Sequence, residues 1–130
     1  MLTNNKPLTE KELREMQPVV LAYIGDAVYE LLVRDHLVRQ EATTLSEQHK
    51  NTISYVAASA QAAAMESLLP LLTEEEHRIF RRGRNARVHS VPGGCTVAQY
   101  HAATALEALF GWLWLSGRAA RAVGLFQVIW

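Results

Sequence analysis

Two long segments of the chain are so apolar that a soluble fold has to bury much of them. Residues 18–33 carry only two formal charges, Asp26 and Glu30, and residues 97–117 carry only one, Glu107. Moving an ionised carboxylate out of water is costly unless a cation or hydrogen-bond donors compensate. Isolated acids on two buried helices therefore predict a metal site.

The length and composition indicate one globular domain spanning residues 1–130. A chain of 130 residues can bury roughly two-thirds of the surface that its unfolded form exposes. With 49% hydrophobic and 20% charged residues, it has no long polar run that would indicate disorder. The single cysteine, Cys95, excludes an intrachain disulfide framework.

The start of the chain is polar over residues 1–11 and lacks the apolar core of a secretory signal, so we expect a cytoplasmic protein. Residues 97–115 are long enough to raise the question of a membrane span. However, they contain Glu107 and three other polar side chains, and an acid in the middle of a span costs roughly 3 kcal/mol on insertion scales. The sequence therefore disfavours a membrane helix.

The charges are distributed unevenly along a chain whose net charge is zero. Residues 1–77 hold 6 Lys and Arg against 12 acids, which gives −6, whereas residues 78–130 hold 7 Arg against Glu107 alone, which gives +6. Five of those arginines fall within ten residues and predict a local basic patch on a neutral protein. The five are Arg78, Arg81, Arg82, Arg84 and Arg87.

The pattern is helical throughout, with no period-2 strand and no hairpin signal. Thr9 with Glu12 forms a capping box that predicts the start of a short helix. Pro18 suits the first turn of the next helix, which we extend to Arg39. An alanine-rich third helix is expected over residues 46–69, ended by Pro70.

Capping and glycine signals also predict the second half of the chain. Thr73 with Glu76 forms another capping box, and the helix that follows is expected to stop at Gly83. Residues 83–95 are expected to form a loop. Thr96 caps the apolar helix that carries Glu107, Gly117 ends it, and a last amphipathic helix fills the C-terminus.

Asp26 and Glu107 lie 81 residues apart, so only the packing of their helices can bring them together. A magnesium or manganese site typically uses one or two carboxylates, several waters and substrate phosphate oxygens. The alternative is that each acid meets a buried arginine or a helix terminus. Glu30, one turn beyond Asp26, is a third ligand, an ion-pair partner or part of an interface. Gly25 allows either another helix or a hydrated metal to approach closely.

The arginine-rich run also has two interpretations. It is a solvated helix end favoured by the helix dipole, or residues 81–85 continue into a loop where charged donors follow a phosphate backbone. The aromatic residues of the apolar segment are interpreted as core or interface residues rather than as base-stacking platforms. They are Tyr100, Phe110, Trp112 and Trp114.

Three segments resemble one family. Residues 21–30, Leu-Ala-Tyr-Ile-Gly-Asp-Ala-Val-Tyr-Glu, resemble the signature helix of the ribonuclease III catalytic domain, and residues 104–111 resemble its second acidic helix. Residues 82–85, Arg-Gly-Arg-Asn, resemble a segment of the short bacterial subfamily, Mini-ribonuclease III, which lacks a double-stranded-RNA-binding domain. Full-length members of the family have further acids where this chain has Ala22 and Thr104, which implies fewer or weaker metal sites.

This resemblance implies an all-α endonuclease domain, a helical bundle that forms a homodimer because two strands require two sites. It implies cleavage of double-stranded RNA with Mg²⁺, for which Mn²⁺ would substitute, leaving 5′-phosphate ends. Asp26 and Glu107 would be the catalytic and metal-binding acids. The apolar signature helix would be the interface, and the substrate would be the precursor of 23S ribosomal RNA.

Double-stranded RNA adopts the A-form helix, which proteins recognise mainly by its shape, through 2′-hydroxyl and phosphate contacts across the minor groove. The residues expected to make these contacts are Arg81, Arg82, Arg84, Asn85, Arg87 and Lys50.

Two other functions remain open from the sequence. A non-catalytic RNA-binding or ribosome-associated module on the same fold predicts RNA affinity that survives loss of Asp26, without strand cleavage. A helical adaptor for protein partners predicts no effect of magnesium on stability and no salt-dependent RNA binding.

Overall fold

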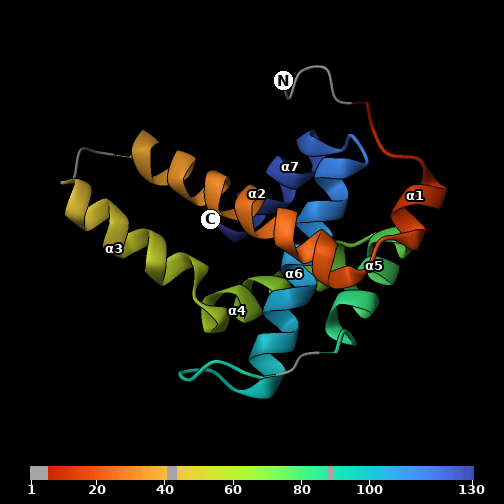
Figure 1. The fold of residues 1–130 in the computed structure, drawn as a ribbon. Coiled ribbons are helices and arrows are strands. Elements are labelled where there is room, and N and C mark those ends of the chain that lie inside the picture. The colour runs from red at the N-terminus through yellow and green to blue at the C-terminus, as the bar shows by residue number, and fades with distance from the viewer. Residues whose placement is uncertain (1–5, 41–43, 88–89) are drawn as a thin grey trace.

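The computed structural model describes residues 6–40, 44–87 and 90–130, and these residues form an all-α fold (Figure 1), as predicted. No helix among the described residues is long and apolar enough to cross a membrane. Within the same ranges there are seven α-helices and one short 3₁₀ helix, η2. They are α1 (Glu10–Glu15), α2 (Pro18–Arg39), α3 (Leu45–Val56), α4 (Ala58–Leu68), η2 (Leu69–Leu71), α5 (Glu74–Arg84), α6 (Val97–Leu115) and α7 (Ala119–Ile129).

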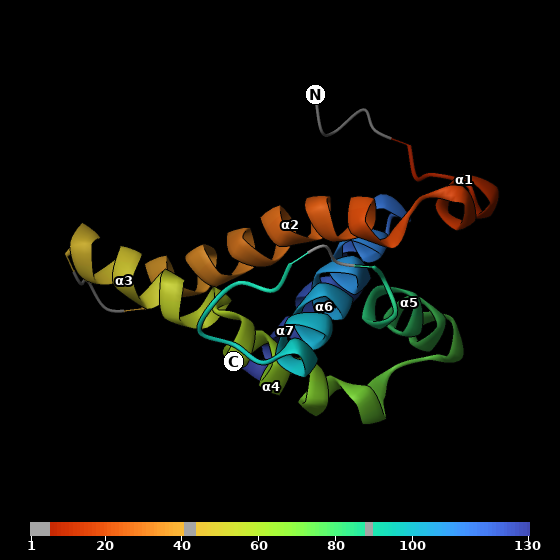
Figure 2. The same cartoon turned by 60° about the horizontal axis from the view of Figure 1, so that its bottom comes forward.

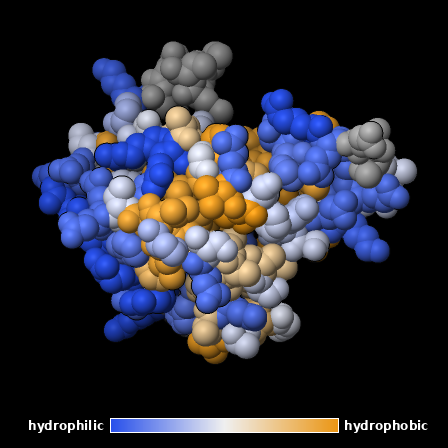
Figure 3. All heavy atoms as spheres, turned by 180° about the vertical axis from the view of Figure 1, so that it is seen from behind, coloured by the Kyte–Doolittle hydropathy of each residue, from blue (hydrophilic) through white to orange (hydrophobic). Residues whose placement is uncertain are grey.

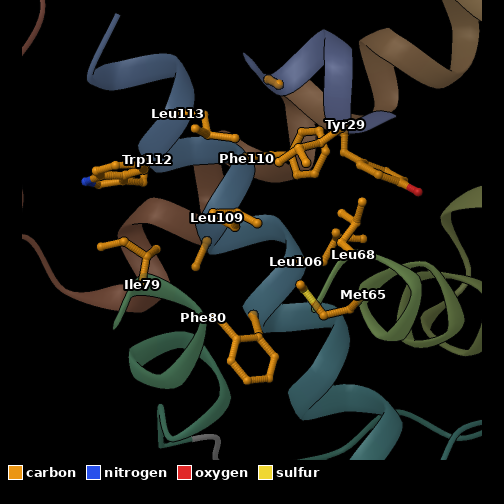
Figure 4. Packing of buried hydrophobic residues seen from close by; sticks show 14 of the residues in the cluster. Tyr29, Met65, Leu68, Ile79, Phe80, Leu106, Leu109, Phe110, Trp112 and Leu113 are labelled. Carbon is orange, nitrogen blue, oxygen red and sulfur yellow. The ribbon is translucent and has the colours of Figure 1, made fainter. Parts of the chain in front are cut away.

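Helix α6 lies at the centre of the fold, with α2, α4 and α5 packed against different sides of it (Figures 1 and 2). Every α6 residue from 103 to 113 is buried except Glu107. A helix that is enclosed in this way must be apolar on all sides, which explains the composition of its segment. Figure 4 shows Leu109 and Leu113 of α6 in the core that α2, α4 and α5 complete.

The outer surface is mostly polar. On the face opposite to that of Figure 1, polar side chains surround an apolar area in the middle (Figure 3). Burial therefore concentrates around α6, and the helices around it each contribute one face to the core.

Helices α2 and α6 cross at two glycines. A Cβ atom added at Gly25 would overlap the backbone carbonyl of Glu107, and one added at Gly111 would overlap the backbone carbonyl of Leu21. The two backbones are thus in direct contact, which only residues without a side chain permit. Of the two interpretations of Gly25, the close approach of another helix is the one observed.

The prediction of a single helix over residues 46–69 is wrong, because this segment forms two helices, α3 and α4. The chain breaks at Ala57, whose φ of −59° and ψ of 146° are not helical, and α3 and α4 follow different directions. Helix α3 packs against α2 whereas α4 packs against α6, and one straight helix does not cover both partners. The break follows residues 52–56, a run of mostly β-branched and aromatic side chains with weak helix propensity.

The predicted stop at Gly83 is also wrong. Gly83 is buried inside α5, and a Cβ atom there would lie 2.8 Å from the Cα atom of Ala105 and 3.0 Å from the Cβ atom of Ala108. The glycine therefore serves the packing of α5 on α6. The helix continues to Arg84 and is capped by Asn85, whose N–H donates to the carbonyl of Arg81 at 3.0 Å.

The other predicted helix ends are confirmed. Thr9, Thr73 and Thr96 each accept a hydrogen bond from the backbone of the third residue of their helix. Helix α2 has the predicted bounds. Gly117, at a φ of 77°, ends α6 in the left-handed conformation that glycine adopts without strain.

A buried ion pair joins α5 to α7. Glu76 is 3% exposed, and Arg121 donates from Nε and Nη2 to its two carboxylate oxygens, each at 2.9 Å. The backbone N–H of Thr73 donates to the same carboxylate. Burial by itself would raise the pKa of Glu76, but the hydrogen bonds from Arg121 and Thr73 outweigh it and hold the pKa below its usual value of 4.5.

Replacement of Glu76 by Gln is expected to lower the free energy of unfolding by about 1–3 kcal/mol at neutral pH. The figure is modest because Arg121 is partly exposed and water screens the pair. Because the folded pKa of Glu76 is lowered, the contribution is complete above about pH 4.5 and is lost as pH falls through that lowered pKa. Urea denaturation at several pH values measures the difference. Glu74→Gln, which removes an exposed acid from the same helical turn, is the control; equal losses in both variants would contradict the role of the buried pair.

Replacement of Gly25 by Ala is expected to destabilise the protein by about 3 kcal/mol or more, because the new methyl group forces α2 and α6 apart. Gly124→Ala in α7 is the matched control, since a Cβ atom there meets nothing within 4 Å. This control is expected to be neutral or to stabilise by up to about 1 kcal/mol. Thermal unfolding compares the two, and a tolerated Gly25→Ala would contradict the close crossing.

Candidate metal centre

Asp26 on α2 and Glu107 on α6 meet beside the glycine crossing. Gly25 precedes Asp26 and packs against the backbone of Glu107, which places the two acids on neighbouring positions of the crossing helices. The carboxyl groups of Asp26 and Glu107 lie close enough to interact, and the side chain of Gln61 on α4 lies close to that of Glu107. Three helices that are far apart in the sequence thus converge on one pair of acids.

The two acids differ in burial. Glu107 is partly buried, whereas Asp26 is exposed, so the expectation that both lie in buried segments is wrong for Asp26. Helix α2 buries a single stripe that includes Leu21, Gly25 and Tyr29, and Asp26 lies beside that stripe. The site is therefore open to solvent on the Asp26 side and closed on the Glu107 side.

The surroundings of Glu107 favour its protonated form. Burial, then the hydrogen bond with Asp26 and the negative charge of that residue, raise the pKa of Glu107 to about 8, while a hydrogen bond from Gln61 acts to lower it. Two neighbouring carboxyl groups in a partly buried site cannot both ionise cheaply. A cation bound between them would remove this penalty.

The donor set fits a hard divalent cation. Carboxylate oxygens are preferred by Mg²⁺, which is often held by one or two carboxylates while it keeps several waters and binds substrate phosphate. Residues 6–40, 44–87 and 90–130 contain no group of three or more His, Cys, Asp or Glu side chains that could hold a metal. Asp26 and Glu107 therefore offer the smaller ligand set, and this leaves room for water and phosphate.

The alternative pairing with arginine is not observed. In the described part of the chain, none of the ion pairs involves Asp26 or Glu107. Glu30 forms an ion pair with Arg34 at 3.1 Å, so its ion-pair alternative is the one seen. Ala22 and Thr104 do not add metal ligands to the site. Ala22 is buried, and the hydroxyl of Thr104 donates to the carbonyl of Tyr100 at 2.9 Å.

More of the arginine-rich run is helical than the sequence predicted. Arg81, Arg82 and Arg84 belong to the end of α5 rather than to a loop. Arg82 donates to the carbonyl oxygens of Met16 at 2.6 Å and Arg14 at 3.4 Å, so part of its hydrogen-bonding capacity holds the end of α1.

The remaining basic candidates are exposed. The guanidinium of Arg84 lies 5.2 Å from the ring centre of Phe80, and Asn85 and Arg87 follow at the helix end. Lys50 lies on α3, which is on the other side of α6 from α5 (Figure 1). The structure thus groups the arginines with Asn85 but does not bring Lys50 to them.

Gln61 is a residue of the site that the sequence did not predict. Its signal is the spacing of the buried α4 residues, Gln61, Ala64, Met65 and Leu68, in which Gln61 is the only polar member. The expectation of one long helix obscured this face, because the break at Ala57 determines which side of α4 meets α6.

The comparisons with known proteins place the chain in one family. The Ribonuclease III domain family matches residues 19–118. The Mini-ribonuclease 3 of Symbiobacterium thermophilum is 43% identical over 112 residues, which cover 86% of each chain. That of a Thermoanaerobacter species is 41% identical over 127 residues, which cover 98% of this chain and 89% of the relative. The crystal structure of a Fusobacterium nucleatum protein superposes with a TM-score of 0.82 at 28% identity and covers 91% of this chain and 94% of that one.

Replacement of Glu107 by Gln is expected to stabilise the metal-free protein increasingly as pH rises. The folded protein keeps the Glu107 proton until about pH 8, whereas the unfolded chain releases it near 4.5. Within this window the unfolded state binds fewer protons, so the stability of the wild type falls with pH, and glutamine removes that dependence. Urea denaturation in EDTA measures the difference.

Glu66→Gln, at an exposed position of α4, is the control for this comparison. If the wild type and Glu107→Gln show parallel pH dependence between about pH 4.5 and 8, the assigned environment of Glu107 is wrong.

Proposed function

The chain belongs to the ribonuclease III domain family, and we propose that it is a magnesium-dependent endoribonuclease that cleaves double-stranded RNA. The observation that carries this proposal is the meeting of Asp26 and Glu107 across the α2–α6 crossing. Both are acids in apolar segments, and placing them close together lowers the stability of the fold. A protein that only bound RNA would gain nothing from this arrangement.

The acids have separate tasks in this proposal. Bound Mg²⁺ would activate water for in-line attack on a phosphodiester and neutralise charge on the leaving 3′ oxygen. Asp26 offers its oxygens on the open side of the site, where a phosphate enters. Glu107 offers its oxygens from the closed side and gives up its proton when the cation binds. The product carries a 5′-phosphate end.

Binding of the duplex is assigned to the basic residues around the end of α5. Arg81, Arg84 and Arg87 are exposed and would contact phosphate and 2′-hydroxyl oxygens together with Asn85. Arg82 would contribute the part of its guanidinium that α1 does not use. Lys50 would reach a separate part of the duplex, because α3 lies across α6 from α5.

The proposed substrate is the precursor of 23S ribosomal RNA, processed in the cytoplasm by residues 1–130 acting as one domain. This choice is supported by the similarity to the Mini-ribonuclease 3 proteins.

We also propose that the protein acts as a homodimer through α2. This helix exposes apolar side chains along one face, among them Tyr23 at 84% and Leu31 at 64% exposed. The remaining members of the face, at helical spacing, are Val20, Ala27 and Val38, and the exposed Arg34 lies on the same face between Leu31 and Val38. Several large apolar side chains exposed on one helix face are typical of an interface. A symmetric pair would supply one site for each strand of the duplex.

The cleavage experiment compares wild type, Asp26→Asn and Glu107→Gln on a long labelled duplex in Mg²⁺. Both variants are expected to lose at least about 100-fold in activity while they still bind the duplex, because loss of a metal ligand removes several kcal/mol of transition-state stabilisation. Glu66→Gln is the control for an exposed acid, and EDTA and single-stranded RNA are expected to give no cleavage. If the wild type binds duplex but never cuts it in Mg²⁺ or Mn²⁺, the RNA-binding module becomes the better account.

Replacement of Leu31 by Arg is expected to convert the dimer to a monomer, because it puts a charge in the centre of the apolar face. Sedimentation equilibrium is expected to show a dissociation constant raised by about 100-fold or more. Leu45→Arg on α3, also at an exposed leucine, is the control. A wild type that stays monomeric at high concentration would contradict the proposed interface.

A further inference from the structure

We propose that Gln61 is a positioning residue that holds the carboxylate of Glu107 in the orientation needed to bind the cation. The inference rests on the proposed function, since it concerns the same site. It assigns to Gln61 no contact with RNA and no part in the chemical step.

The position of Gln61 in the fold supports this role. It lies in the first turn of α4 and is 3% exposed. It shares the buried stripe of α4 with Ala64, Met65 and Leu68, whose spacing places all four on the face that packs against α6. Figure 4 shows Met65 and Leu68 directed toward Leu106, the α6 residue next to Glu107.

A polar side chain at such a position needs a hydrogen-bond partner, because an unpaired buried amide is costly. Helix α6, against which this stripe packs, offers one carboxyl group, that of Glu107, and the Gln61 side chain lies close to it. The amide N–H group donates to one carboxylate oxygen, which fixes the orientation of the side chain and leaves its other lone pairs for a cation. Outer partners of this kind commonly orient the ligands of a metal site.

The chemistry of the amide suits this task. It is neutral, so it neither competes with the cation nor repels it. As a donor, the amide N–H group can pair with one carboxylate oxygen of Glu107 while the other oxygen faces the cation.

The break at Ala57 explains why Gln61 can reach Glu107. At this residue the chain leaves α3, which packs on α2, and begins α4, which packs on α6. Gln61 follows four residues after the break, in the first turn of α4. The kink that separates the two helices therefore also places the amide.

The test uses Gln61→Met, which removes the amide while it keeps a long, unbranched side chain in the buried stripe. In RNA-free protein, calorimetric titration with Mn²⁺ is expected to show affinity 10–100-fold below that of the wild type, the range typical for loss of such a partner. With saturating duplex, kcat is expected to fall by about the same factor while KM stays within about twofold, because Gln61 is too buried to contact RNA.

Two further variants separate positioning from packing. Met65→Leu alters the same buried stripe one turn further along α4 without touching a polar group, and it is expected to keep wild-type Mn²⁺ affinity. Gln61→Asn keeps an amide but withdraws it by one methylene group, and it is expected to lose Mn²⁺ affinity as Gln61→Met does. Gln61→Asn also replaces Gln61→Met as the test variant if Gln61→Met does not fold.

The outcomes are distinguishable. Wild-type Mn²⁺ affinity and kcat in Gln61→Met, or in Gln61→Asn, would overturn the proposal, as would a loss in Met65→Leu equal to that in the Gln61 variants. If the wild type itself neither binds Mn²⁺ nor cuts duplex, the proposed function fails first and the role of Gln61 falls with it.

Discussion

The close approach of α2 and α6 is the constraint on which the rest of this fold depends. Gly25 and Gly111 let the two backbones touch, and a methyl group at either position would have to push the helices apart. At this separation α6 can be enclosed by α2, α4 and α5, so its apolar sequence is satisfied by its surroundings. The same contact brings together Asp26 and Glu107, which are distant in the chain.

The site that results is favourable for binding a cation and unfavourable for stability without one. Glu107 is partly buried beside a second carboxyl group, and its pKa is raised to about 8 in consequence. Such a penalty is common where a functional site requires groups that the fold would otherwise separate. Gln61 offsets part of it with a neutral donor that a binding cation does not need to displace.

The features that sequence predicts well here are local. The capping boxes at Thr9, Thr73 and Thr96 involve residues three positions apart, so the sequence contains all the information that determines them. Asp26 and Glu107 could be selected because the two apolar segments hold few acids, and because the resemblance to the ribonuclease III family singles out Asp26 over Glu30. The prediction that Asp26 is buried was wrong, because α2 has two apolar faces, one buried against α6 and one exposed.

The features that sequence did not predict depend on contacts between distant elements. The break at Ala57 follows from α3 and α4 having different partners, and Gly83 is needed because α5 packs on Ala105. The pairing of Glu76 with Arg121 also joins residues far apart in the chain. Gln61 was missed for the same reason, because a neutral side chain in an alanine-rich helix gives no signal until the face that meets α6 is known.

The central claim is that Asp26 and Glu107 together form a cation site. Diffraction from a crystal grown with Mn²⁺, recorded at a wavelength where manganese scatters anomalously, tests it most directly. The account predicts an anomalous peak about 2 Å from a carboxylate oxygen of each acid. A map with no peak between these two carboxylates, at a Mn²⁺ concentration that supports cleavage, would contradict it.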